Sequence, residues 1–288
     1  MNMPNGISFA DAESTYNDAD ICIYGIPYDH TSCFRAGARE GPSAVRRCSY
    51  NFERTHFEHG PLPELSVFDY GDCDDFIYPE DMIDEVKFAM SPAINDGKFT
   101  IAIGGEHSIN IPIIQLFEEK SIALISIDAH LDGRDEYMGS TNSHACITRR
   151  AADHLGIDNV YALGMRSISE EELEADEVIP YISAYDIHEN GMEWAVRKAL
   201  DSVKADKVYL TIDIDGIDPA YAPGTGTPEP FGLHPYDVKK AINMMGDRLV
   251  GFDICEVCPP ADPTGATPVL AARLIKEVMA VYAKNMKA

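Results

Sequence analysis

The sequence predicts an α/β protein: a single-domain, three-layer αβα sandwich built on a central, parallel, doubly wound sheet. Two observations carry this prediction. Strand-like and helix-like stretches alternate along the chain, a pattern typical of parallel sheets with helices on both faces. Several strand-like stretches are short, continuous apolar runs, as in strands that are buried on both faces. We expect residues 1–288 to form one domain, with residues 1–20 at its periphery.

The elements of the first half follow from apolar runs and from the positions of proline and glycine. Pro42 suits the first turn of a helix, Gly71 ends a strand, and Pro92 predicts a kink or break in a helix. Residues 53–64 are expected to form a loop. The predicted strands are 21–24, 67–70, 100–103 and 121–127, and the predicted helices are 41–51, 79–95 and 110–119.

The second half continues the alternation. Ser169 followed by three glutamates predicts a capped helix start, with acidic residues where the helix dipole favours them. A loop rich in Pro and Gly spans residues 218–232. The predicted strands are 159–163, 181–182, 208–212 and 250–254, and the other predicted helices are 144–155, 192–203, 235–245 and 267–287.

Composition narrows the classes of partner and compartment. The formal charge of −25 over 288 residues argues against nucleic acid or an anionic membrane surface as the main partner. No early segment resembles a signal peptide, and no apolar run approaches the ~20 residues that span a bilayer. The seven cysteines, an odd number scattered along the chain, suit a reducing compartment. We therefore expect a soluble, cytoplasmic protein.

Acidic and histidine residues follow three of the predicted strands. The run 121–127 leads into Asp128, His130 and Asp132, and residues at this spacing in extended backbone point to one side. The run 208–212 leads into Asp213 and Asp215. Paired glycines after residue 103 allow a sharp turn that presents His107. Three strand ends thus offer four aspartates and two histidines.

A single strand that ends in Asp is commonplace, since Asp caps turns and helix starts. Four acids at one edge of a sheet, however, would repel one another, and no cluster of Lys or Arg accompanies these motifs. Bound cations are the simplest remedy. Six ligands are too many for one catalytic zinc ion and suit two metals, with Mn²⁺ favoured by oxygen-rich ligation that includes imidazole. Two such ions, roughly 3.5–4 Å apart, can share a water that loses its proton and becomes a nucleophile.

Charge accounting then favours a cationic substrate. Four aspartates cancel two divalent ions, and a bridging hydroxide with one nearby glutamate would leave the pocket at about −2. Guanidinium is planar, permanently charged at neutral pH, and pairs bidentately with carboxylate.

Together, the motifs Gly104–Ser108, Asp128–Asp132 and Asp213–Pro219 resemble the signature motifs of the ureohydrolase (arginase/agmatinase) family. The resemblance implies an arginase-like αβα fold and a binuclear centre with two Mn²⁺ per subunit. It implies bridging roles for Asp128 and Asp215. It also implies a homo-oligomer, either a trimer or a hexamer. The implied metal ligands are His107, Asp128, His130, Asp132, Asp213 and Asp215.

Two further residues carry over from the same resemblance. His144 matches the family's mobile histidine, which delivers a proton to the departing amine. Glu256 matches the glutamate that anchors the guanidinium. Without the resemblance, His144 reads as a helix-start histidine and Glu256 as an acid that ends a strand.

Within the family, the segment 133–143 and the loop 222–229 resemble prokaryotic agmatinases rather than arginases. The sequence is therefore expected to hydrolyse agmatine to putrescine and urea, by attack of a metal-bridging hydroxide. The sequence departs from the family pattern at Phe231 and at Ala145-Cys146, and both departures are expected to border the substrate cleft. Alternative substrates are guanidinobutyrate, arginine and formimidoylglutamate, for which Arg134 would supply a partner to the carboxylate. A non-catalytic, metal-dependent polyamine-binding protein is the alternative outside the enzymes.

Overall fold

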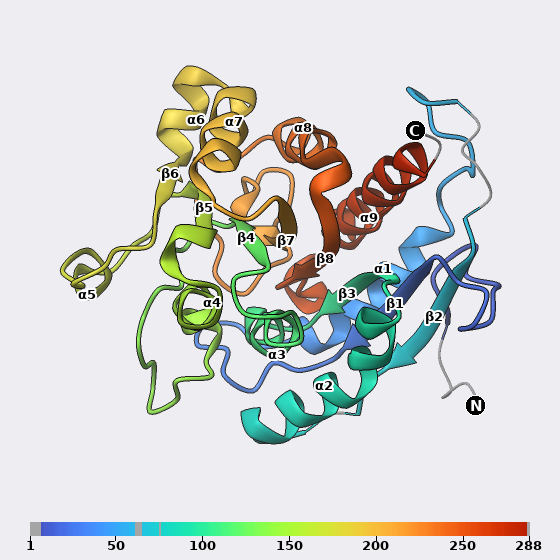
Figure 1. Cartoon of the computed structure of the whole chain (residues 1–288), viewed down its shortest axis with the longest axis horizontal. Helices are drawn as coiled ribbons and strands as arrows, with labels where there is room; N and C mark the ends of the chain where they lie inside the picture. The colour runs from blue at the N-terminus through green and yellow to red at the C-terminus, as the bar shows by residue number, and fades with distance from the viewer. Residues whose placement is uncertain (1–6, 61–64, 75, 287–288) are drawn as a thin grey trace.

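A computed structural model describes residues 7–60, 65–74 and 76–286. Eight strands form one sheet in the order β2-β1-β3-β8-β7-β4-β5-β6, and every neighbouring pair is parallel (Figure 1). The predicted fold class is confirmed. The strands are β1 (Ile21–Ile26), β2 (Val67–Asp72), β3 (Phe99–Gly104), β4 (Ile122–Ile127), β5 (Val160–Met165), β6 (Tyr181–Ser183), β7 (Lys207–Asp213) and β8 (Leu249–Cys255).

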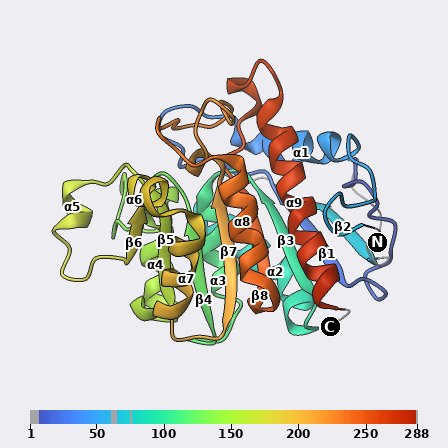
Figure 2. The ribbon, with the colours of Figure 1, turned by 90° about the horizontal axis from the view of Figure 1, so that it is seen from above.

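Helices cover both faces of the sheet and complete the three layers. Figures 1 and 2 show α7, α8 and α9 on one side of the strands and α2, α3 and α4 on the other. Among the described helices, none is long and apolar enough to cross a membrane. The α-helices are α1 (Gly41–Ser49), α2 (Pro79–Asn95), α3 (Asn110–Ile114), α4 (Ile147–Leu155), α5 (Glu170–Leu173), α6 (Ala184–Asn190), α7 (Met192–Ser202), α8 (Pro235–Met245) and α9 (Ala266–Asn285).

The inner strands are apolar on both sides because each side faces its own core. In β4, Ala123, Ile125 and Ile127 belong to one buried cluster, while Ile122 and Leu124 belong to the other. This alternation is the period of two expected of a strand. It leaves the end of β4 as the first place where a polar side chain can reach solvent or a ligand.

The segment before β1, which was expected to lie at the periphery, is partly tied to the core. Phe9 is buried, and its backbone N–H donates to Asp69 Oδ2. Asp69 also accepts a bidentate pair of hydrogen bonds from the buried guanidinium of Arg46, at 2.8 and 2.9 Å. The N–H of Ala10 donates to Ser49 Oγ in α1. These contacts fasten the described part of the segment to β2 and α1.

Some element boundaries differ from those predicted. The helix α2 continues through Pro92 without the expected break, since only three residues follow Pro92 and little of the helix depends on the missing N–H. The helix expected to reach residue 119 ends at Ile114, because the N–H groups of Leu116 and Phe117 bond to carbonyls three residues back. Residues 144–146 form a 3₁₀ turn ahead of α4. The capped start at Ser169 is confirmed, with a complete capping box.

The helix α6 was not predicted. Ser183 caps its N-terminus by accepting from the N–H of Asp186, and Gly191 follows its last residue with a φ of 85°. These are ordinary start and stop signals, but the segment between them is too short for a clear helical periodicity.

Candidate metal centre

Four adjacent central strands position the site. Asp128 follows β4, Asp213 ends β7, and Asp215 lies in the 3₁₀ turn after it. His107 begins a 3₁₀ turn after β3. Because all the strands are parallel, their carboxyl ends share one edge of the sheet, where ligands bind in doubly wound folds. In space the order is β3-β8-β7-β4, so motifs that lie far apart in the chain become neighbours.

The turn that presents His107 requires glycine. A Cβ on Gly105 would lie 1.9 Å from the carbonyl oxygen of Tyr28. The backbone approaches this closely because the N–H of Glu106 donates to the same oxygen, at 2.7 Å. No side chain fits there.

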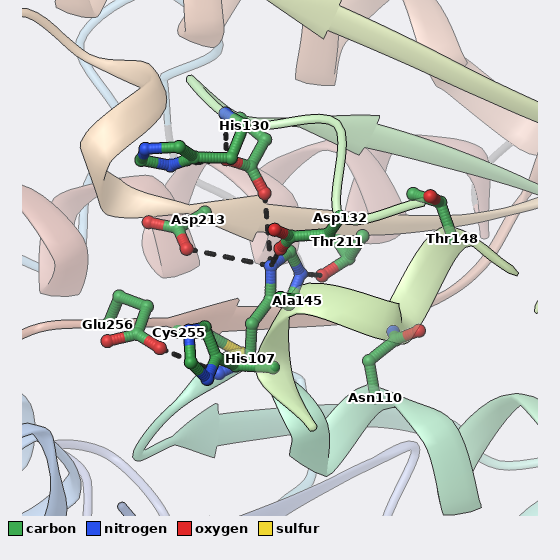
Figure 3. Close-up of polar contacts among 12 residues, drawn as sticks. His107, Asn110, His130, Asp132, Ala145, Thr148, Thr211, Asp213, Cys255 and Glu256 are labelled. Carbon is green, nitrogen blue, oxygen red and sulfur yellow. Dashed lines mark hydrogen bonds and ion pairs between the residues drawn. The ribbon is translucent and has the colours of Figure 1, made fainter. Parts of the chain in front are cut away.

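The first group of polar side chains converges on His107 Nδ1. This atom lies 3.1 Å from Asp128 Oδ2, 3.4 Å from Asp132 Oδ2 and 3.5 Å from Asp213 Oδ2. Figure 3 shows the ring pointing toward Asp132 and Asp213. Asp132 reaches the group from a left-handed backbone conformation, with a φ of 51°, so the chain has already left the extended conformation that the i, i+2, i+4 spacing assumed. The three side chains of that motif nevertheless converge.

The second group forms around His130. Its Nδ1 lies 3.0 Å from Asp215 Oδ2 and 3.7 Å from Asp128 Oδ1. Asp128 therefore faces both groups, with one carboxylate oxygen directed to each. All six residues predicted as ligands are brought together by the fold, in two groups that share this carboxylate.

The charges of the cluster call for cations. Within the described ranges, no Lys or Arg forms an ion pair with any of these four aspartates. Burial raises the pKa of Asp132 to about 7, with a further increase from the nearby Asp128. Burial, with Asp215 and Asp128 adding to it, likewise raises the pKa of Asp213 well above its ordinary value. Such carboxylates are held in their charged form only when positive charge is close.

Two atoms test whether the cluster fits metal ions. His107 Nδ1 and Asp128 Oδ2 are buried, and neither has a hydrogen-bond partner among the described residues. Buried polar atoms almost always have a hydrogen-bond partner. Two buried atoms whose lone pairs face the same point without such a partner therefore fit binding to a metal ion. The donor set, imidazole nitrogen and carboxylate oxygen, matches a divalent transition metal.

A hydrogen-bonded chain behind His107 fixes which ring nitrogen faces the cluster. His107 Nε2 lies 2.8 Å from Thr211 Oγ1, and the Thr211 hydroxyl donates to Asp253 Oδ1 at 2.5 Å. Asn110 Nδ2 donates to the other oxygen of Asp253. Since the only proton of the hydroxyl is directed to Asp253, Thr211 accepts from His107 Nε2–H. The lone pair of Nδ1 therefore faces the carboxylates.

This chain was missed by reasoning from sequence. Thr211 precedes Asp213 by two residues and so lies on the same face of β7, which is a local signal. Asp253 is on β8, opposite Thr211 in the sheet register. Only the pairing of β7 with β8 shows that the two side chains meet.

Arg166 holds the loop after β7, and it too was missed. Its guanidinium donates to the backbone carbonyls of Asp215 (2.6 Å) and Gly216 (3.2 Å), and also to those of Gly164, Glu229 and Pro230. One planar group with five N–H donors thus ties β5 to the turn that carries Asp215.

A cavity of about 190 Å³ opens beside the two groups. Ala145 borders it, as expected, whereas Cys146 is fully buried and Phe231, at 70% exposure, is not among the described lining residues. Its functional lining includes His130, Asp132, Arg134, His144, Asp213 and Glu256.

The two predicted catalytic residues both reach this cavity. Glu256 accepts a hydrogen bond from the backbone N–H of His107, at 2.9 Å. Burial, with Glu106 next in effect, raises the pKa of Glu256 well above its ordinary value. Burial also lowers the pKa of His144 to about 4. His144 is therefore neutral at pH 7.

Comparisons with known proteins agree with this arrangement. The family model "Arginase family" matches residues 19–281. An agmatinase from Bacillus anthracis is 34% identical over 97% of this chain and 98% of its own length. A guanidinobutyrase from Pseudomonas aeruginosa is 32% identical over 91% of this chain and 86% of its own length. The structure of the agmatine ureohydrolase of Thermoplasma volcanium superposes with a TM-score of 0.93 and 38% identity, covering 99% of this chain and 97% of that one.

These matches confirm the resemblance indicated by the three motifs. They extend over nearly the whole chain, and the structural match includes the sheet whose edge carries the two ligand groups. The chain therefore belongs to the arginase family and is a ureohydrolase, a hydrolase that acts on amidine C–N bonds.

Proposed function

We propose that this ureohydrolase is a manganese-dependent agmatinase, which hydrolyses agmatine to putrescine and urea. The observation that carries the proposal is the cavity itself. It brings Glu256 and His144 together with residues of both ligand groups, so one small cationic substrate can meet all of them. The full-length similarity to agmatinases supports agmatine as that substrate.

The arginase family is metal-dependent, and two groups suitable for a metal are present around His107 and His130. We assign both groups to Mn²⁺, because carboxylate oxygens outnumber imidazole nitrogens. Two bound ions would neutralise the aspartates and supply a water nucleophile that is active near neutral pH. The proposed ligands are His107, Asp128, His130, Asp132, Asp213 and Asp215.

The protein's own groups bind and orient the substrate. Glu256 is buried, lines the cavity and offers a carboxylate that can pair with the planar guanidinium. Neutral His144 is placed to take up a proton from the attacking water and to give it to the amine that departs as the C–N bond breaks. As the amine accepts this proton, the leaving group becomes putrescine.

One observation favours a second candidate. The guanidinium of Arg134 lines the cavity and stacks on the ring of Tyr137, with 4.8 Å between its Cζ and the ring centroid. A cation at this place would attract a substrate with a carboxylate at the far end, such as guanidinobutyrate. One relative of this chain is named a guanidinobutyrase, which supports guanidinobutyrate as the alternative substrate.

The test is urea release by the Mn²⁺-loaded protein with agmatine, arginine and guanidinobutyrate, each at the same concentration. We expect agmatine to be preferred by at least about tenfold in kcat/KM, roughly 1.4 kcal/mol in transition-state binding. A preference for guanidinobutyrate would instead show that the substrate carries a carboxylate, with Arg134 as the residue proposed to bind it. Release of urea from none of the three would refute agmatine hydrolysis and would favour the alternative of a non-catalytic, metal-dependent polyamine-binding protein.

The ligand assignment is tested by Asp128→Asn, which keeps the size of the side chain but removes the negative charge that faces both groups. We expect this variant to lose metal and activity together. Normal turnover with Asn at this position would contradict the assignment of Asp128 as a ligand to both ions.

A further inference from the structure

A buried carboxylate and a threonine lie behind His144, outside the ligand set. Glu106 precedes His107 and is fully buried. Thr31 lies in the loop that follows β1 (Ile21–Ile26). The Thr31 hydroxyl is 2.5 Å from Glu106 Oε1 and 3.0 Å from His144 Nδ1, so it joins the two side chains.

The carboxylate of Glu106 is surrounded by donors. Oε2 accepts from the backbone N–H of Thr31 at 2.7 Å and from the Ser32 hydroxyl at 3.4 Å. Oε1 accepts from the Thr31 hydroxyl and from the Ser108 hydroxyl, each at 2.5 Å. Four donors satisfy the acceptor capacity of an ionised carboxylate, which has no proton of its own to give.

The protons at Thr31 can then be assigned. A hydroxyl has one proton and two lone pairs, and the proton of Thr31 is directed to Glu106. The lone pairs accept from the backbone N–H of His144, at 3.1 Å, and from the ring at Nδ1. Because that proton is directed to Glu106, we assign the proton of the Thr31–His144 contact to Nδ1, which also lies 3.3 Å from the Ser143 hydroxyl. The ring is also held by Tyr137, in an edge-to-face contact with 5.6 Å between centroids.

We propose that Thr31 and Glu106 are positioning residues that hold His144 as the Nδ1–H tautomer and leave Nε2 as the nitrogen that exchanges protons with the substrate. The inference rests on the proposed role of His144 in catalysis. When Nε2 takes up a proton, the ring becomes an imidazolium that still donates from Nδ1 to Thr31. When Nε2 gives that proton to the departing amine, the same neutral tautomer returns.

Burial raises the pKa of Glu106, and the hydrogen bonds from Ser108 and Thr31 oppose that shift. Positive charge on the ring would face this carboxylate across one hydroxyl, and no Lys or Arg pairs with Glu106 in the described part of the chain. Carboxylates that orient a catalytic histidine act in the same sense, by fixing its tautomer and stabilising its protonated form. Here a threonine hydroxyl lies between the two.

The variants separate positioning from folding. Thr31→Val keeps the shape of the side chain and the backbone N–H to Glu106 but removes the hydroxyl, whereas Thr31→Ser keeps the hydroxyl. Ser32→Ala is the matched control, since it removes a hydroxyl from the same carboxylate without a contact to His144. All three are made in the full-length chain.

The first readout is kinetic, with Mn²⁺-loaded enzyme and agmatine over a range of pH. We expect Thr31→Val to lower kcat by roughly 10- to 100-fold, part of the 10²- to 10⁴-fold that general acid–base catalysis contributes, with KM and metal content unchanged. Thr31→Ser should recover most of this loss, and Ser32→Ala should resemble the wild type. Equal kcat in the Val and Ser variants would overturn the proposal.

The second readout does not depend on activity. Nitrogen chemical shifts of the histidine rings in the metal-free protein report which nitrogen is protonated, and the His144 signal is identified by its loss in His144→Gln. We expect a proton on Nδ1 in the wild type and in Thr31→Ser, and a shift toward Nε2–H in Thr31→Val. A wild-type ring protonated on Nε2 would overturn the positioning role, whereas failure to release urea with the expected tautomer intact would overturn only the proposed function.

Discussion

The hydrogen bonds of the Thr211 hydroxyl predict how much stability and metal affinity the protein loses when this hydroxyl is removed. Thr211→Val keeps the shape of the side chain but removes the group that accepts from His107 Nε2–H and donates to Asp253. Asp253 would keep Asn110 and a weaker contact from the Cys255 thiol at 3.3 Å. His107 is fully buried and would keep no partner for Nε2–H.

The cost follows from the two groups left unsatisfied. An unpaired buried donor or acceptor costs about 1–3 kcal/mol, and the remaining bonds to Asp253 place the sum in the lower half, at about 2–4 kcal/mol. For 288 residues at about 2.1 cal/mol/K each, the entropy of unfolding is about 0.6 kcal/mol/K. The metal-free variant should then melt about 3–7 °C lower. Loss of the group that orients His107 should also weaken metal affinity by about 10- to 100-fold.

The assays are urea unfolding of the metal-free protein and a calorimetric titration with Mn²⁺. Thr211→Ser retains the hydroxyl and should keep the metal affinity. Thr100→Val is the matched control for the chemical change, because Thr100 is fully buried and its Oγ1 has no hydrogen-bond partner among the described residues. If Thr211→Val and Thr100→Val are equally stable and bind Mn²⁺ equally well, the proposed hydrogen-bonded chain has no energetic role.

Three further predictions concern charge. Removing the cavity guanidinium by Arg134→Ala should favour agmatine over guanidinobutyrate by about 1 kcal/mol, roughly fivefold in the ratio of kcat/KM; an unchanged ratio would exclude Arg134 from substrate selection. In Arg46→Met, the carboxylate of Asp69 loses its cation although its side chain is only 1% exposed. This variant should lower the free energy of unfolding by about 3–5 kcal/mol. Urea denaturation measures this loss, and Arg46→Met with Asp69→Asn should be less destabilised than the sum of the two single variants. For Asp262, burial raises the pKa, but hydrogen bonds from Thr264 and Thr267 outweigh it and lower the pKa to about 2 from an ordinary 3.8. This folded-state value lies below the unfolded one, so a stabilisation of about 2 kcal/mol is present above pH 3.8 and is lost as the pH falls toward 2; the stability difference between wild type and Asp262→Asn, followed by denaturation from pH 5 to pH 3, should shrink accordingly.

The architecture follows from local patterns. The apolar runs that became β3 and β4 are short and buried on both faces, and no antiparallel arrangement buries them as well. The capped start of α5 was predicted from Ser169 and the glutamates after it, because these signals lie within a few residues of one another. The bounds predicted for α8, residues 235–245, are those observed. The C-terminal end of α3 was less predictable, since it depends on how the chain packs after Ile114.

The six proposed ligands could also be found from sequence. Each lies at the end of a strand or in the turn after it, and the carboxyl ends of parallel strands share one edge, so their convergence needs only the fold class. The roles of His144 and Glu256 could not be derived in this way. They came from a resemblance, and the structure adds that both side chains reach the same cavity.

The amino-acid sequence by itself thus determined the parallel sheet, the edge that carries the site and the residues that crowd it, because side-chain direction and burial repeat over a few residues. Only the tertiary structure decided what supports them. Thr31 meets His144 across 113 positions, and Thr211 meets Asp253 across 42. The second contact depends on β8 becoming the neighbour of β7, and the first depends on the segments after β1 and β4 meeting at one edge of the sheet. That choice is made by the packing of the whole chain and leaves no periodic trace in the sequence around either partner.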